Sequence, residues 1–156
     1  MSVCVIVLIQ CDSKKNKSIS TNQSVIPYSD LYELALEKGD TIAYHHLSMD
    51  YLDSPNDWFL STALKMANRY DNKDAYMDVF YCLTGYYHKK EEELLINLDN
   101  RTRDMALEYL KLASDKGEIN AKKLLGEYYL EGKYLQKNEI LGKQLIEEVN
   151  ISISSK

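Results

Sequence analysis

The sequence is poor in the residues that shape turn-rich and cross-linked folds. Two prolines and six glycines among 156 residues are too few for a β-sandwich or a barrel. The three cysteines form no CxxC pair and no even framework of the kind that cross-links small secreted domains. With 19 Lys and Arg against 24 Asp and Glu, the formal net charge is −5, which argues against a nucleic-acid partner. These features favour one acidic, largely helical domain.

Motifs of catalysis and metal binding are also missing. The sequence contains no HExxH, no glycine-rich phosphate loop and only three histidines, His45, His46 and His88. His45 and His46 are adjacent, so on a helix they point about 100° apart and do not easily share one metal ion. Cys82 is expected to be a small buried side chain on a helix. We therefore predict a non-enzymatic protein with no catalytic residue, no metal and no cofactor.

The N-terminus changes character at Cys11. Residues 3–9 are all apolar apart from Cys4, and residues 12–26 form a polar stretch typical of a flexible tether. The apolar run is too short to cross a bilayer as a helix, but it has the length of a signal-peptide core. An apolar run, a cysteine and a polar tether resemble the end of a bacterial lipoprotein signal peptide, although Gln10 is larger than the residue usual before the cysteine. The resemblance implies that residues 1–11 contain a signal ending at Cys11, which would be lipidated. The alternative is a cytoplasmic protein in which the run is a short buried element.

Three segments of the sequence align without gaps and predict a repeated helix–turn–helix unit. Each has two alanines eight residues apart, with a residue that tolerates left-handed backbone four positions after the first alanine. The alanine pairs are 35/43, 67/75 and 113/121, the turn residues are Gly39, Asp71 and Gly117, and the following caps are Asp40, Asn72 and Glu118. Small side chains at the turn suit two antiparallel helices that approach closely. Helices are expected over 28–38, 40–52, 57–70, 73–88, 90–98, 103–116, 119–131 and 138–149.

The last copy resembles a known family. Residues 121–132, AKKLLGEYYLEG, match the Sel1-like repeat, a helical-hairpin relative of the tetratricopeptide repeat. In the earlier copies Ser48 and Phe80 replace the glycine that follows the central apolar residue, Gly126 in the last copy. The resemblance implies an all-α fold, an α/α superhelical solenoid of about three Sel1-like hairpins over residues 27–150, followed by a tail at 151–156.

Thirteen tyrosines, against two phenylalanines and one tryptophan, are the most unusual feature of the composition. Tyr51 and Tyr129 occupy the family's buried tyrosine position and are expected in the core. Tyrosine also suits an interface, because it offers a large area, few rotatable bonds and one polar group. The predicted partner-binding residues are Tyr44, His45, Tyr76, Tyr86, Tyr87, Tyr128 and Tyr134. For each of these tyrosines, packing within the hairpin is the alternative.

The family resemblance implies a protein that binds one protein or peptide partner. The sharpest hypothesis is a periplasmic, membrane-anchored immunity protein that neutralises a toxic effector by direct binding, since an acidic surface suits a basic toxin domain. In this hypothesis the lipid on Cys11 is the only membrane contact. A periplasmic scaffold or signalling adaptor is the alternative. A third hypothesis is an envelope enzyme, such as a β-lactam-binding Sel1-repeat protein, but the cysteine pairs of those proteins are absent here.

Overall fold

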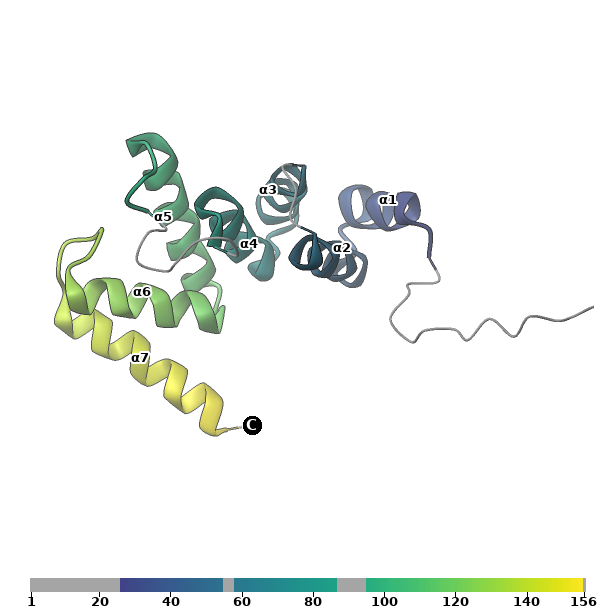
Figure 1. Ribbon diagram of the computed structural model, residues 1–156. Coiled ribbons are helices and arrows are strands. Elements are labelled where there is room, and N and C mark those ends of the chain that lie inside the picture. The colour runs from purple at the N-terminus through teal and green to yellow at the C-terminus, as the bar shows by residue number, and fades with distance from the viewer. Residues whose placement is uncertain (1–25, 55–57, 87–94, 156) are drawn as a thin grey trace, which may run out of the picture.

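The computed structural model describes residues 26–54, 58–86 and 95–155. In these ranges every regular element is a helix, which confirms the predicted all-α class (Figure 1). The predicted signal at 1–11, Cys11, and all of the 12–26 tether except Ile26 lie outside the described residues, as do Tyr87 and His88. The helices are α1 (Tyr28–Lys38), α2 (Thr41–Asp53), α3 (Phe59–Tyr70), α4 (Lys73–Thr84), α5 (Asn100–Asp115), α6 (Ile119–Glu131) and α7 (Glu139–Ser154).

The three predicted tight turns are present at the predicted residues. Gly39, Asp71 and Gly117 have φ of 70°, 54° and 83°, which lies in the left-handed region. The next residue caps the following helix in each case, because its side chain accepts hydrogen bonds from backbone N–H groups that have no helical partner. The caps are Asp40 before α2, Asn72 before α4 and Glu118 before α6. Local backbone chemistry thus decides where these helix pairs fold back.

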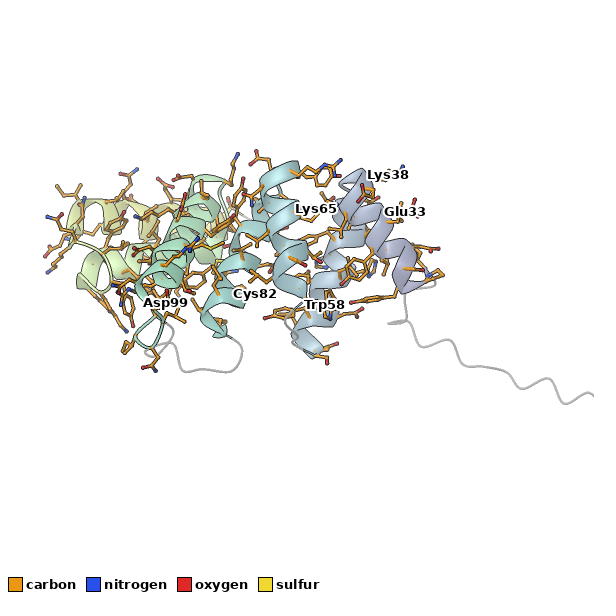
Figure 2. All side chains as sticks on the ribbon, turned by 90° about the horizontal axis from the view of Figure 1, so that it is seen from above. Glu33, Lys38, Trp58, Lys65, Cys82 and Asp99 are labelled. Atoms are coloured by element: carbon orange, nitrogen blue, oxygen red, sulfur yellow. The ribbon has the colours of Figure 1, made fainter. Side chains whose placement is uncertain are left out.

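The helices form a row in which each packs against its neighbours in the chain (Figure 1). Helices α1, α3 and α5 lie along one side of the row, and α2, α4 and α6 lie along the other. Figure 2 places Trp58, Cys82 and Asp99 along the edge of the row opposite to Lys38, beside which the first tight turn lies. Side-chain hydrogen bonds also join three pairs of helices that are two positions apart in the chain, α1 with α3, α3 with α5, and α2 with α4. The bonds are Tyr70 Oη to the Leu36 carbonyl at 2.9 Å, Asn68 Nδ2 to Tyr109 Oη at 2.7 Å, and Tyr44 Oη to Asp78 Oδ2 at 2.6 Å.

One continuous apolar core runs along the row. Its aromatic centre near the N-terminal end is Phe59, which has no exposed surface and stacks between Tyr44 and Tyr51 with ring centroids 5.9 and 4.6 Å away. Alanines at the turns, among them Ala35, are completely buried because a larger side chain would separate the paired helices. Each helix therefore buries its apolar side chains against the helices next to it in the row.

The pair α6 and α7 crosses at two glycines. A Cβ atom on Gly126 would lie 3.2 Å from the Gly142 carbonyl oxygen, and one on Gly142 would lie 2.8 Å from the Gly126 carbonyl oxygen. Only residues without a side chain allow the two backbones to approach this closely. Gly126 is the glycine that the sequence comparison singled out in the last copy, and its partner Gly142 comes from the next helix.

Some helix boundaries differ from those expected. Helix α4 ends at Thr84 rather than near residue 88, because Gly85 adopts φ 68° and terminates it. In the segment predicted as a helix over 90–98, residues 95–97 form turns and residues 90–94 lie outside the described residues. Helix α7 continues to Ser154, beyond the expected end near residue 149, and the Ser152 and Ser154 hydroxyls bond to carbonyls four residues earlier at 2.8 Å.

Candidate partner-binding surface

The side of the row formed by α2, α4 and α6 carries a mixed apolar and polar surface, here called the even face. On α2, Ile42 is 70% exposed and Met49 is 45% exposed, with the exposed His45 and His46 between them. Ile42 and Met49 are seven residues apart, so they lie on one side of the helix. Single exposed apolar residues are common on protein surfaces, but two in register on one helix form a small patch.

Equivalent positions on the neighbouring helices are less exposed than those on α2, and Met77 and Leu124 among them are buried. The gapless alignment of the turns relates positions 42, 45, 46 and 49 to positions 74, 77, 78 and 81 on α4 and 120, 123, 124 and 127 on α6. Between α4 and α6 these positions line a shallow hollow of about 120 Å³. The residues around it are Met77, Tyr81, Tyr86, Asn120, Lys123, Leu124 and Glu127. The even face is therefore apolar on α2 and becomes polar towards α6.

Asp78 lies where α2 meets α4, and its carboxylate is the most unusual group on this side of the molecule. Tyr44 Oη donates a hydrogen bond of 2.6 Å to Asp78 Oδ2. Burial raises the pKa of Asp78 to about 7, although the hydrogen bond from Tyr44 lowers it, and the carboxylates of Asp74 and Glu118 raise it further. Asp78 is consequently a carboxyl group whose protonation changes near neutral pH.

A thiol lies one turn further along α4. Burial raises the pKa of Cys82 to about 11, and the negative charge of Asp78 adds to this, while a hydrogen bond with Tyr51 opposes it. A thiol with a raised pKa is a poor nucleophile, because the reactive species is the thiolate. The structure therefore gives Cys82 the character of a packing residue rather than of a catalytic one.

The predicted partner-binding residues fall into two groups. Tyr44, Tyr76 and Tyr128 are 2%, 8% and 3% exposed, so their rings pack between helices. Tyr76 Oη donates to Asp71 Oδ1 at 2.9 Å, which ties α4 to the turn before it. At these three positions the tyrosine ring thus packs between helices, which is the alternative to partner contact that the sequence left open.

The other predicted residues within the described ranges are more accessible. His45 is exposed on α2 beside Ile42, and Tyr86 is half-buried with its ring 4.5 Å from that of Tyr81 at the hollow. Tyr134 is half-buried and rests edge-on against Tyr128 at 5.2 Å. Of the predicted residues that the structure describes, His45 is therefore exposed on the even face and Tyr86 borders the hollow.

The sequence reasoning did not single out Ile42, Met49 and Asp78. Ile42 and Met49 resemble core residues in the sequence, because an apolar residue in a helix is usually buried. The signal in the sequence is their position relative to Ala43 and Leu47. These two residues are buried, and the helical period places Ile42 and Met49 on a different, solvent-facing side of α2. For Asp78 no local signal exists, since its burial depends on Tyr44, 34 residues earlier.

In the described parts of the chain, no cluster of three or more His, Cys, Asp or Glu side chains is arranged to hold a metal ion. None of the described helices combines the length and the apolar character needed to cross a membrane. Comparison of the chain with protein-family models, with curated proteins and with solved structures found no match.

Proposed function

We propose that this chain is a non-enzymatic protein-binding module and that the even face holds its single protein partner. One observation supports the proposal: the even face combines two apolar residues, Ile42 and Met49, exposed in register on α2, with a polar hollow between α4 and α6. Protein interfaces commonly combine a few apolar anchors with a polar rim. The even face has that composition.

For the fold, we propose a solenoid of about three Sel1-like hairpins. The three turns that share left-handed residues and side-chain caps support it, as does the close glycine crossing of α6 and α7. Solenoids of this kind bind partners along an extended face built from equivalent helices of successive repeats. Helices α2, α4 and α6 are equivalent in this sense.

The charge of the even face favours a basic partner. Asp74 is exposed on α4, Glu118 begins α6, and Glu127 lies at the hollow 4.0 Å from Lys123, which leaves the acidic groups in excess. Such a face steers a basic surface towards itself and increases the association rate. A toxic effector with a basic domain is the partner that this hypothesis names, and the chain would then be its immunity protein, anchored in the envelope through a lipid on Cys11.

Co-expression with the product of the adjacent reading frame tests the proposal. If that product is toxic, we expect the chain to restore growth and to co-purify with it. Ile42→Glu combined with Met49→Glu should abolish both effects, because it places two charges in the apolar part of the interface. The matched control is Ile151→Glu, which changes an isoleucine of 62% exposure on α7 and should retain protection.

Each outcome separates the hypotheses. Neither protection nor a complex rejects the immunity role, whereas a complex with a non-toxic product that Ile42→Glu disrupts supports a scaffold or adaptor. Loss of function on His45→Ala and His46→Ala, with full function in the Ile42 and Met49 variants, would favour an enzyme instead. Incorporation of a palmitate analogue, with Cys11→Ala as the control, tests the anchor independently.

A further inference from the structure

Three aromatic rings form a cluster at the N-terminal end of the row, on the opposite side of α1 and α3 from the tight turns. The Tyr28 ring lies 5.2 Å from that of Tyr32 and 6.0 Å from that of Trp58, and the Tyr32 and Trp58 rings are 5.3 Å apart. Tyr28 meets the other two rings edge to face, at interplanar angles of 70° and 89°, and the Tyr32 and Trp58 rings are tilted by 59°. Figure 2 shows Trp58 at the beginning of α3, on the edge away from Lys38. The rings therefore hold one another in place, and together with Ile26 they are called here the aromatic end.

Three of the four residues of the aromatic end are exposed. Ile26, Tyr28 and Trp58 are 43%, 41% and 38% exposed, whereas Phe59, the residue next to Trp58, is completely buried. Tyr32 is half-buried and packs against the core, whereas Tyr28 and Trp58 do not belong to it. The adjoining rings of Tyr28 and Trp58, with Ile26 two residues before Tyr28 in the chain, offer more apolar area than a single exposed residue.

The chemistry of these residues suits the boundary between water and lipid. Tryptophan and tyrosine concentrate at that boundary in membrane proteins, because the ring enters the acyl region while the N–H or O–H stays among the headgroups. Isoleucine adds apolar area without a polar group. The charged groups beside the cluster are carboxylates, since Asp30 follows Tyr28 in α1 and Asp50 contributes to a raised pKa of Tyr28. Such a surface fits zwitterionic lipid better than anionic lipid.

The position of the cluster in the chain agrees with this environment. Ile26 is 15 residues after Cys11, and 15 residues span at most about 50 Å. A chain tethered to a bilayer at Cys11 thus keeps the aromatic end within reach of the lipid. Helix α7, at the other end of the row, also exposes three isoleucines, Ile140, Ile151 and Ile153, but it contains no tryptophan or tyrosine.

We infer that the aromatic end inserts into the headgroup region of a zwitterionic bilayer and orients the row of helices on the membrane. This inference depends on the proposed envelope location for its setting, but it adds a protein–lipid contact to the lipid anchor. A single acyl chain holds a protein only weakly, and a second apolar contact makes attachment stable. The orientation also keeps the even face at a set position relative to the membrane surface.

Trp58 is the only tryptophan, so its fluorescence reports on the aromatic end alone. The full chain is mixed with phosphatidylcholine vesicles that contain lipid brominated near the top of the acyl chains. We expect the Trp58 emission to shift to shorter wavelength and to be quenched by the bromine, more weakly when anionic phosphatidylglycerol replaces part of the phosphatidylcholine. Vesicle binding by residues 3–9 does not produce this signal, because quenching requires contact with Trp58 itself.

Matched variants test the individual contacts. Ile26→Ser should weaken partitioning of the Cys11→Ala chain into these vesicles by about fivefold, since it removes one apolar side chain from the lipid. Ile151→Ser, which removes an exposed isoleucine from the opposite end, should leave partitioning unchanged. Equal effects of the two substitutions would overturn the inference.

The same measurements separate this inference from the proposed anchoring. A palmitate label on Cys11 with no quenching of Trp58 would retain the anchor and overturn the lipid contact. Quenching without a label would retain the lipid contact and reject the anchor. A Trp58 emission that responds to the protein partner but not to vesicles would assign the aromatic end to protein binding and likewise overturn the inference.

Discussion

Replacing Asp78 with asparagine should change how the stability of the fold depends on pH. Burial raises the pKa of the Asp78 carboxyl from its ordinary value of 3.8 to about 7 in the folded chain. Between these two values the folded state holds a proton that the unfolded state has lost, so stability is greatest below about pH 4 and falls as the pH rises to about 7. Asparagine does not ionise, and its side-chain oxygen still accepts the hydrogen bond of Tyr44.

The size of the effect follows from the shift. About three pKa units at 1.36 kcal/mol each give an upper bound of about 4 kcal/mol. Asp78 retains some contact with solvent, which reduces the bound to about 2–4 kcal/mol. The stability of the Asp78→Asn variant relative to the unmodified chain should therefore increase by this amount between about pH 4 and about pH 8.

Urea unfolding, monitored by far-ultraviolet circular dichroism at several pH values across this range, measures the difference in unfolding free energy between the variant and the unmodified chain. Carboxylates with lowered pKa values act in the opposite direction at acidic pH, but both chains contain them, so they cancel. They are Glu37, Asp71, Asp99, Glu139 and Glu148. Asp74→Asn, which removes an exposed carboxyl one turn earlier on α4, is the control and should retain most of the decline of the unmodified chain. Parallel pH profiles of the unmodified chain and the Asp78→Asn variant would refute the reasoning.

Four further substitutions test the packing of the row, each by its effect on the free energy of unfolding in urea. Phe59→Ala should destabilise the fold by about 3–5 kcal/mol, because it removes a completely buried ring; a loss below about 1 kcal/mol would show that the site collapses. Gly39→Ala should cost more than Gly117→Ala, since both have positive φ but only the first would place a methyl group 2.5 Å from the ring of Tyr70; equal losses would show that this ring moves freely. Gly142→Ala would bring a methyl group 2.7 Å from a leucine carbon of α6, so a loss of about 1–3 kcal/mol is expected, and an unchanged stability would contradict the close crossing.

Much of the fold was predictable because its turns depend on neighbouring residues. Gly39 and Asp71 adopt left-handed backbone, and Asp40 and Asn72 cap the next helices, through bonds that span two or three positions. The end of α4 at Gly85 follows the same chemistry, but an apolar and aromatic sequence beyond it suggested a longer helix.

The candidate surface was predictable only in part. Among the predicted partner-binding residues, His45 is exposed on the even face, whereas the rings of Tyr44 and Tyr76 are enclosed by helices. An aromatic residue at a given helical position serves equally well in a core or an interface, and the choice depends on which helix packs against it. Tertiary contacts made that choice here.

By itself, the sequence determined the helical class, the three turns and their caps, since these follow from backbone preferences that act over a few residues. The tertiary structure decided which side chains became accessible. It buried Asp78 against a tyrosine 34 residues away, left Ile42 and Met49 on the surface, and brought the rings of Tyr28 and Trp58 to within 6.0 Å. Those outcomes depend on how helices stack on one another, and segments distant in the chain meet only when the row is assembled.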